Sequence, residues 1–183
     1  MSTTLRNIEE RDLERIMRWR MDPDITRYMN TNPKLTLDGQ KRWLESIRTN
    51  ADVMYWMILV DGQEAGVINL TGLTNPEGNL GWAYYVGEKK LRSIQLALSL
   101  EMSLYDYIFD GLHKNALYGD IFTLNQGVIR LHQICGSEIV GEKKAHVCKE
   151  GVSYDVTFMR MTRQRWEEIR STKKYAKIDF SIQ

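Results

Sequence analysis

The stretch LRSIQLALSLEMSLYDYIFDGL, residues 91–112, limits the possible folds of this chain more than any other segment. Its apolar residues fall on nearly every side of a helix, so a helix over 92–109 must be buried on most of its surface. An aromatic strand pattern, NLGWAYYVG, precedes it, and a second strand pattern, ALYGDIFTL, follows it directly. This order favours two parallel strands joined by a helix that covers their sheet. We therefore expect an α/β domain.

The segment before the aromatic strand predicts an antiparallel meander. The run VMYWMILV (53–60) is rich in residues that favour strands, and the turn Asp61-Gly62 separates it from EAGVINLTGL. A second turn, Asn75-Pro76-Glu77-Gly78, leads into the aromatic strand. Two tight turns between three strand patterns indicate neighbouring strands that run in opposite directions.

The two ends of the chain complete a mixed sheet. Apolar spacing of three and four predicts helices in RDLERIMRWRM, which Asp22-Pro23 ends, and in LTLDGQKRWLESIRTN, with Thr36 as N-cap. The remaining predicted elements are an edge strand at 3–10, a helix at 125–134, and strands at 137–147 and 152–162. The expected order is β-α-α-β-β-β-α-β-α-β-β, a mixed sheet of about seven strands with helices on both faces.

The composition indicates the number of domains and the cellular environment of the chain, but it says little about its function. The 183 residues fit one domain, and the net charge of +1 supplies no overall attraction to nucleic acid or to an anionic membrane. No apolar run approaches the roughly 18 residues of a membrane helix. The polar start MSTTLRNIEERD and only two cysteines favour a reducing, cytoplasmic setting.

The segment NQGVIRLHQICGS (125–137) resembles the N-x-x-(S/A)-I-x-L-Y-x-x-x-G-F helix of the GNAT superfamily of acetyl-CoA-dependent N-acetyltransferases. The positions that match are Asn125, Ile129, Leu131 and Gly136. His132 stands at the position of the tyrosine and Ser137 at that of the phenylalanine. The resemblance extends along nearly the whole chain and implies one domain, 1–183, with the GNAT fold and acetyl-CoA as co-substrate, without a metal.

Two further segments point to branches of that superfamily. The closing YDVTFMRMTRQRW is similar to the end of the branch that includes ribosomal-protein acetyltransferases. The early RWRMDPDITRYMNT and LTLDGQKRWLESI resemble the acceptor-binding entry of acetyltransferases that act on nucleotide-linked 4-amino sugars, as in pseudaminic acid synthesis. A homodimer is a further expectation for this chain.

The phosphate-binding signature of the superfamily, (Q/R)-x-x-G-x-(G/A), is matched with one departure. The corresponding residues are Arg92, Ser93, Ile94, Gln95, Leu96 and Ala97. Backbone N–H groups at a helix N-terminus hold the pyrophosphate of CoA, and glycine permits close approach, so Gln95 puts the affinity for CoA in doubt. The resemblance implies further contacts to CoA from Val86, Gly87, Asn125, Ile129 and Arg130.

Acetyl transfer to an amine requires a polarised thioester carbonyl and a proton for the departing thiolate. The resemblance places the backbone N–H that polarises the carbonyl near Tyr85 to Gly87, with Tyr85 as a catalytic position. It makes His132 the general acid, since an imidazole titrates at about pH 6.5 and a phenol at about pH 10.

Two other roles remain open for His132. It could be a cation near a helix C-terminus. It could also join Cys135, His146 and Cys148 as metal ligands, although this spacing is unlike the usual zinc knuckles.

No carboxylate lies in the aromatic strand before Glu88, so no general base is evident there. An amine on a sugar ring is less basic than a lysine, which slightly favours a sugar amine. The residues expected to shape the acceptor pocket are Arg20, Tyr28, Met29, Asn30, Trp43, Trp82 and Tyr84. Trp43 could instead belong to the core, and Arg20 could face a diphosphate or end its helix.

Three functions are therefore compatible with the sequence. The first is an N-acetyltransferase for a nucleotide-linked amino sugar. The second is the same chemistry on a protein N-terminus or a polyamine, for which an open groove or an acidic pocket would be expected. The third is a CoA-binding module without catalysis, suggested by Gln95 and the missing tyrosine.

Overall fold

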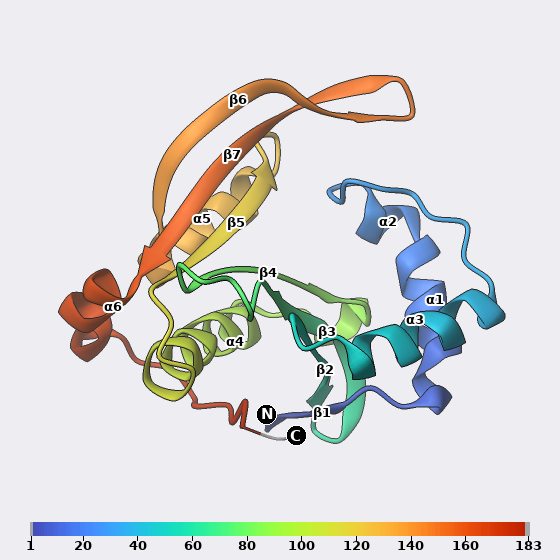
Figure 1. The fold of residues 1–183 in the computed structure, drawn as a ribbon, viewed down its shortest axis with the longest axis horizontal. Helices are drawn as coiled ribbons and strands as arrows, with labels where there is room; N and C mark the ends of the chain where they lie inside the picture. The colour runs from blue at the N-terminus through green and yellow to red at the C-terminus, as the bar shows by residue number, and fades with distance from the viewer. Residues whose placement is uncertain (1, 182–183) are drawn as a thin grey trace.

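The computed structural model describes residues 2–181, which form a seven-stranded mixed sheet in the order β1-β2-β3-β4-β5-β7-β6 (Figure 1). The strands are β1 (Thr3–Asn7), β2 (Val53–Val60), β3 (Gln63–Thr71), β4 (Asn79–Val86), β5 (Ala116–Phe122), β6 (Glu138–Lys149) and β7 (Val152–Thr162). The predicted fold class and strand number are confirmed.

Strands β2, β3 and β4 form the expected antiparallel meander, and β1 pairs antiparallel with β2 at the edge of the sheet. Asp61 and Gly62 turn between β2 and β3 with φ of 48° and 78°, a conformation that glycine adopts without strain. The continuous apolar run of β2 is buried on both faces: Trp56 and Ile58 join one hydrophobic cluster and Met57 joins the other. Because side chains alternate along a strand, both faces of the sheet must therefore be covered.

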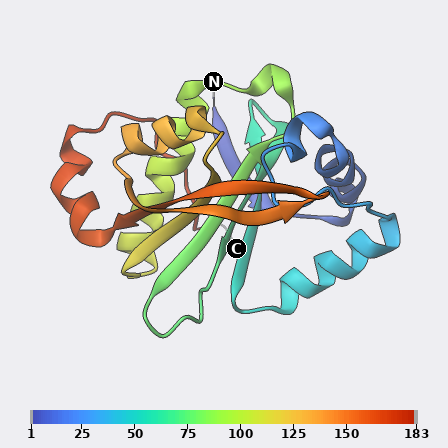
Figure 2. The same ribbon diagram turned by 90° about the horizontal axis from the view of Figure 1, so that it is seen from above.

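Helices cover the two faces of this part of the sheet (Figures 1 and 2). Helix α4 (Ile94–Asp106) packs on the face of Trp56 and Ile58. Helices α1 (Leu13–Met21) and α3 (Leu37–Thr49) pack on the face of Met57 and Val67. No helix among residues 2–181 is long and apolar enough to cross a membrane.

Helix α4 is shorter than the predicted 92–109 at both ends. Ser93 precedes it in an extended conformation, and its hydroxyl accepts a hydrogen bond from the Leu96 N–H at 3.1 Å, so the serine is an N-cap. At the other end the chain widens into a single π-turn, Tyr107–Gly111. A short 3₁₀ turn, Lys89–Leu91, lies between β4 and the helix.

Two short helices were not expected. Helix α2 (Pro23–Thr26) begins with the proline that ends α1, because proline suits the first position of a helix and the Asp22 carboxylate caps the Asp24 N–H. Helix α6 (Arg163–Ile169) follows β7, capped by Thr162, and buries Trp166 completely.

Helix α5 (Gln126–Cys135) lies close to the predicted 125–134. It ends as expected at Gly136, whose φ of 109° favours glycine. The N–H groups of Gly136 and Ser137 both donate to the His132 carbonyl.

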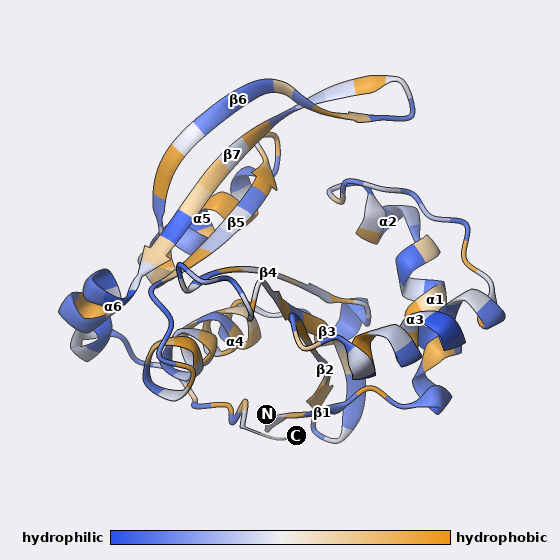
Figure 3. Cartoon of the chain, in the orientation of Figure 1, coloured by the Kyte–Doolittle hydropathy of each residue, from blue (hydrophilic) through white to orange (hydrophobic). Residues whose placement is uncertain are grey.

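The predicted parallel pair is present, but it is short. Asn79–Gly81 of β4 pair with residues 116–118 of β5, and beyond them the two strands separate. The antiparallel β6–β7 hairpin extends from β5 and bends over toward α2 (Figure 1). Much of β6, which is an edge strand of the sheet, consists of hydrophilic residues (Figure 3).

Candidate active site

A cavity of about 790 Å³ opens where β4 and β5 separate. Its walls come from the second half of β4, the start of α4, the first turns of α5, and the segment from α1 through α2 to α3. The cavity therefore joins the expected CoA end of the site to the expected acceptor end.

The start of α4 forms one end of the cavity, where Arg92, Ser93 and Ala97 are among the lining residues. The first intrahelical hydrogen bond runs from the Ala97 N–H to the Ser93 carbonyl. The N–H groups of Ile94 and Gln95 precede that bond, so they are free of helical partners. A helix N-terminus with such donors suits an anionic phosphate.

The glutamine that replaces the glycine of the signature does not obstruct this helix start. Gln95 lies inside the helix with φ in the ordinary negative range, and its side chain is exposed. Leu96 differs from the prediction, since its side chain is buried in the core and its N–H is bound by Ser93. The backbone N–H groups that remain available to a phosphate are therefore those of Ile94 and Gln95, which precede Leu96 in the helix.

The free edge of β4 supplies a second set of backbone donors. The Gly78 carbonyl accepts a hydrogen bond from the Ala116 N–H of β5, which shows that the backbone groups of Gly78 face β5. The Val86 carbonyl accepts a hydrogen bond from the Arg92 guanidinium at 2.9 Å. Because N–H and C=O directions alternate along a strand, Tyr84 and Val86 share this edge, whereas Tyr85 faces β3 opposite Val67. The register favours Val86 over Tyr85 as the donor to a thioester carbonyl.

Gly87 has a packing role in the structure. A Cβ atom at this position would lie 2.2 Å from the Trp19 ring, so only glycine allows the ring to approach the end of β4 so closely. Trp19 is a buried residue of α1 and meets Tyr85 edge to face.

His132 lies in α5, is 6% exposed and lines the cavity. Its Nδ1 atom is 2.8 Å from Oε2 of Glu101, and its ring centroid is 5.2 Å from that of Trp82. The side chain therefore binds α4 rather than the last carbonyls of its own helix.

Glu101 is the functional candidate that the sequence reasoning missed. It is fully buried in α4, where its other oxygen accepts a hydrogen bond from the Tyr105 hydroxyl. That hydroxyl also lies 2.8 Å from the Ser137 hydroxyl. The signal was a carboxylate in the middle of a helix that the apolar pattern predicts to be buried on most of its surface, since a buried charge requires partners.

The cysteine beside this cluster is not arranged as a metal ligand. Cys135 is buried, and burial first, then the Glu101 charge, raises the pKa of its thiol. Cys148 is exposed. Within residues 2–181 no three His, Cys, Asp or Glu side chains could together hold a metal ion.

The other residues expected to bind CoA from α5 divide into two groups. Asn125 lines the cavity at the N-cap position of α5, although its side chain makes no capping hydrogen bond there. Ile129 packs against Ile121 and Met159, and Arg130 is exposed; neither is among the cavity-lining residues.

All of the residues expected at the acceptor end line the cavity, namely Arg20, Tyr28, Met29, Asn30, Trp43, Trp82 and Tyr84. Trp82 stacks on Tyr84 with centroids 5.7 Å apart, and Trp43 meets Tyr55 edge to face at 5.4 Å. Tyr55, Asn69 and Asp120 are among the further lining residues that the sequence reasoning missed.

The charges at the cavity are mixed rather than acidic. Arg20 and Arg92 contribute cations, and the only carboxylates among the lining residues of the described chain are Asp24 and Asp120. Asp24 is paired with Lys89, which lowers the pKa of its carboxyl through their hydrogen bond. Uncompensated negative charge is therefore small.

This architecture, with a parallel strand pair that separates beside a helix N-terminus, defines the class of CoA-dependent acyltransferases. Residues 3–138 match the family described as acetyltransferase (GNAT) domain, which is more than half of the chain. The chain belongs to this family and is an acetyl-CoA-dependent acetyltransferase.

Two similar relatives are acetyltransferases PseH from Campylobacter jejuni subsp. jejuni. That of serotype O:23/36 (strain 81-176) is 26% identical over 143 residues, covering 77% of this chain and 87% of the relative. That of serotype O:2 (strain ATCC 700819 / NCTC 11168) is 24% identical over 126 residues, covering 69% and 76%.

Solved structures share the fold at lower identity. Spermidine N-acetyltransferase from Vibrio cholerae, in complex with CoA and spermine, superposes with a TM-score of 0.83 at 17% identity, covering 90% of this chain and 98% of that one. Aminoglycoside acetyltransferase AAC(6')-Ib, in complex with coenzyme A, gives 0.73 at 22% identity, covering 92% and 99%.

Proposed function

We propose that this acetyltransferase transfers the acetyl group to the 4-amino group of a nucleotide-linked 4-amino-4,6-dideoxy sugar. The observation that carries the proposal is the acceptor end of the cavity, where aromatic rings, Asn30 and Asn69 surround a space without excess negative charge. Aromatic faces suit a nucleobase or a deoxy-sugar ring, and amide side chains suit hydroxyl and acetamido groups. The PseH relatives over most of the chain agree with this acceptor.

The CoA end of the proposed site uses backbone groups. The N–H groups of Ile94 and Gln95 receive the pyrophosphate, with Arg92 as a nearby cation. The N–H of Val86, on the free edge of β4, polarises the thioester carbonyl. These donors are held in place before the reaction, because Ser93 caps the helix and Arg92 binds the end of β4.

The acceptor end holds and orients the amine. Arg20 faces the diphosphate of the acceptor. Trp82 and Tyr84 pack on the α4 side of β4, with Trp82 beside His132, and present their rings to the sugar where it approaches the reacting atoms. His132 lies between the two ends, where it gives a proton to the thiolate that leaves when the carbon–nitrogen bond forms.

Polyamine acetylation is the second candidate, because the spermidine acetyltransferase has a similar fold. A site for a polycation would require several unpaired carboxylates. The cavity instead carries Arg20 and Arg92, and one of its two carboxylates is paired. These charges favour the nucleotide sugar.

A thiol-release assay with a panel of amines tests the proposal. The panel holds a UDP-linked 4-amino-4,6-dideoxy sugar, the same sugar without its nucleotide, spermidine, and a peptide with a free N-terminus. We expect kcat/KM for the UDP-sugar to exceed that for every other amine by at least about 100-fold, which is roughly 2.7 kcal/mol of transition-state stabilisation. A preference for spermidine or the peptide would contradict the proposal.

A further inference from the structure

Glu101 and His132 form a buried pair, and the proposed function assigns no role to Glu101. The Glu101 side chain has no exposed surface, and its two oxygens face the Tyr105 hydroxyl and the His132 Nδ1 atom. A carboxylate in such a position is costly unless donors satisfy it. The Tyr105 hydroxyl donates to one oxygen and the imidazole Nδ1 lies within hydrogen-bond distance of the other, so each oxygen of the buried carboxylate has a partner.

This pair determines which nitrogen of His132 carries the proton. With the Nδ1–H donating to the carboxylate, the Nε2 of the neutral ring has a free lone pair. Since His132 lines the cavity and Nδ1 is occupied, Nε2 is the nitrogen left for a substrate group. A neutral imidazole in this tautomer must first accept a proton at Nε2 before Nε2 can donate one.

Among the side chains that surround His132, Glu101 is the charged group in direct contact with its imidazole ring. Burial raises the pKa of the neighbouring Tyr84, Tyr105 and Cys135, with the Glu101 charge as the second cause, so these three side chains stay neutral. The other groups near this part of the site are Trp82, Ser137, the Asp120 carboxylate of the cavity wall, and Lys173, which binds the Ile134 carbonyl at the end of α5.

We infer that Glu101 is a positioning residue that makes His132 a proton shuttle, with Nε2 first taking a proton from the attacking amine and then giving it to the departing thiolate. This inference rests on the proposed function only in requiring an amine acceptor. It also accounts for the absence of a carboxylate from β4, since the base comes from α5.

The step balances without any other reagent. The amine nitrogen forms a bond to the thioester carbonyl carbon and becomes positively charged, and Nε2 removes one of its protons. The carbon–sulfur bond then breaks, and the same proton passes from Nε2 to the thiolate. The Glu101 carboxylate keeps its charge throughout and stabilises the imidazolium that exists between the two transfers.

Replacement of the carboxylate tests the role of Glu101. Glu101→Gln keeps the shape but can donate to Nδ1, which would place the ring proton on Nε2. With the amine that the panel identifies, we expect kcat to fall roughly 100-fold or more, while KM for acetyl-CoA changes less than about threefold. The acid limb of the kcat/KM profile should move to lower pH, because the imidazolium has lost its counter-ion.

Ser137→Ala is the matched control, since it removes a hydroxyl from the same buried cluster without touching His132 or Glu101. We expect its kcat and pH profile to stay within about twofold of the parent chain. If Glu101→Gln left the single-turnover rate and the pH profile unchanged, the shuttle would be wrong, whichever amine is the substrate.

Nitrogen NMR of the histidine rings gives a readout that requires neither a variant nor a substrate. The chain has three histidines, so the ring signals can be assigned by replacing His113 and His146 in turn. We expect neutral His132 to carry its proton on Nδ1. A proton on Nε2 would overturn the inference while leaving the sugar proposal intact, and failure of the amine panel would do the reverse.

Discussion

At the scale of single residues, the site depends on side chains that meet across two helices. His132 occupies the position of the tyrosine in the helix motif of the GNAT superfamily. In the structure its imidazole is paired with the buried carboxylate of Glu101. An imidazole and a phenol differ in when they carry a transferable proton, so the substitution changes the chemistry and not only the reach of the side chain.

Removal of the imidazole should affect the chemical step. For His132→Ala we expect kcat to fall by roughly 10²- to 10⁴-fold, because general acid–base assistance is lost, with a smaller change in KM for acetyl-CoA. His132→Tyr, the matched comparison, should retain much of the activity at a pH where the amine is neutral. Single-turnover kinetics measure the step directly, and an unchanged rate for His132→Ala would end the catalytic assignment.

A second prediction concerns the cap of α4. Aspartate is as good an N-cap as serine, so Ser93→Asp should preserve the helix but place a negative charge beside the CoA phosphates. We expect the Kd for CoA, measured by calorimetry, to rise roughly tenfold, which is about 1.4 kcal/mol.

Two variants serve as comparisons for that measurement. Ser93→Asn caps the helix without the charge and should bind CoA nearly normally. Gln95→Gly restores the residue of the signature and should bind equally well or better. If Ser93→Asp bound CoA like the parent chain, the pyrophosphate would lie elsewhere.

At the scale of elements, the β6–β7 hairpin bends over toward α2 (Figures 1 and 2), and one side chain attaches the two. The attachment is Lys149 at the end of β6, whose buried Nζ donates to the carbonyls of Thr26 at 2.7 Å and Met29 at 2.9 Å. A cation suits the carbonyl end of a helix. Met29 lines the cavity, so the hairpin supports one wall of the acceptor end.

Loss of this cation should therefore affect the acceptor more than CoA. Lys149→Met keeps the aliphatic stem but leaves the carbonyls without their donor, so we expect a loss of roughly 1.5–3 kcal/mol in the free energy of unfolding. KM for the amine acceptor should rise several-fold and KM for acetyl-CoA should not. Lys143→Met, an exposed position on the same strand, is the control; equal effects of both variants would contradict a specific attachment.

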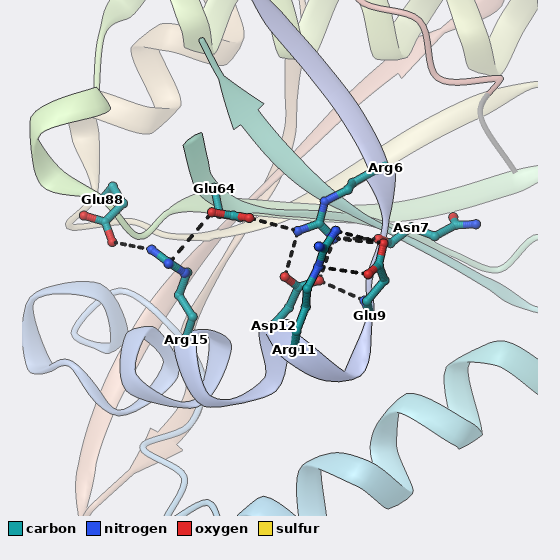
Figure 4. A network of polar contacts seen from close by, with 8 residues as sticks. All are labelled: Arg6, Asn7, Glu9, Arg11, Asp12, Arg15, Glu64 and Glu88. Atoms are coloured by element: carbon teal, nitrogen blue, oxygen red, sulfur yellow. Dashed lines mark hydrogen bonds and ion pairs between the residues drawn. The ribbon is translucent and has the colours of Figure 1, made fainter. Parts of the chain in front are cut away.

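At the scale of the whole molecule, a polar network joins the first strand to the helical layer that carries the acceptor wall (Figure 4). The Arg6 guanidinium of β1 binds both oxygens of Asp12, at 2.6 and 2.7 Å, just before α1. It also reaches Glu64 of β3 at 3.2 Å, and Arg15 of α1 lies near both Glu64 and Glu88. The network therefore holds α1 to the sheet.

The acid stability of the fold should reflect this network. Burial tends to raise the pKa of Asp12, but hydrogen bonds from Arg6 and the Glu9 N–H lower it overall. A carboxyl with a lowered folded-state pKa stabilises the fold above the pKa of the unfolded chain, near 4, and loses that contribution as pH falls through the folded-state value.

Asp12→Asn should accordingly reduce the free energy of unfolding by roughly 1–3 kcal/mol at pH 7, measured with urea. The difference between variant and parent should shrink below about pH 4. Glu10→Gln, at an exposed neighbouring position, should have little effect. A difference for Asp12→Asn that stays constant to pH 3 would mean that its charge is not what stabilises the fold.

The order of helices and strands could be predicted from the amino-acid sequence alone. Period-two and apolar patterns predicted the seven strands, the turn at Asp61-Gly62 and the buried helix, because these patterns report which side of a local segment avoids water. The α5 segment predicted the helix end at Gly136 and the placement of His132. The patterns missed α2 and α6, whose short length leaves too few turns for a period to appear.

Which residues contact one another across the fold could not be predicted from the sequence. Glu101 and His132 are 31 positions apart, and Lys149 and Thr26 are 123 apart. The separation of β4 and β5 beyond Gly81, which opens the cavity, has no local signal either. Periodicity records burial but not the partner, because a partner is chosen by how helices and strands pack and by which buried charges must be satisfied.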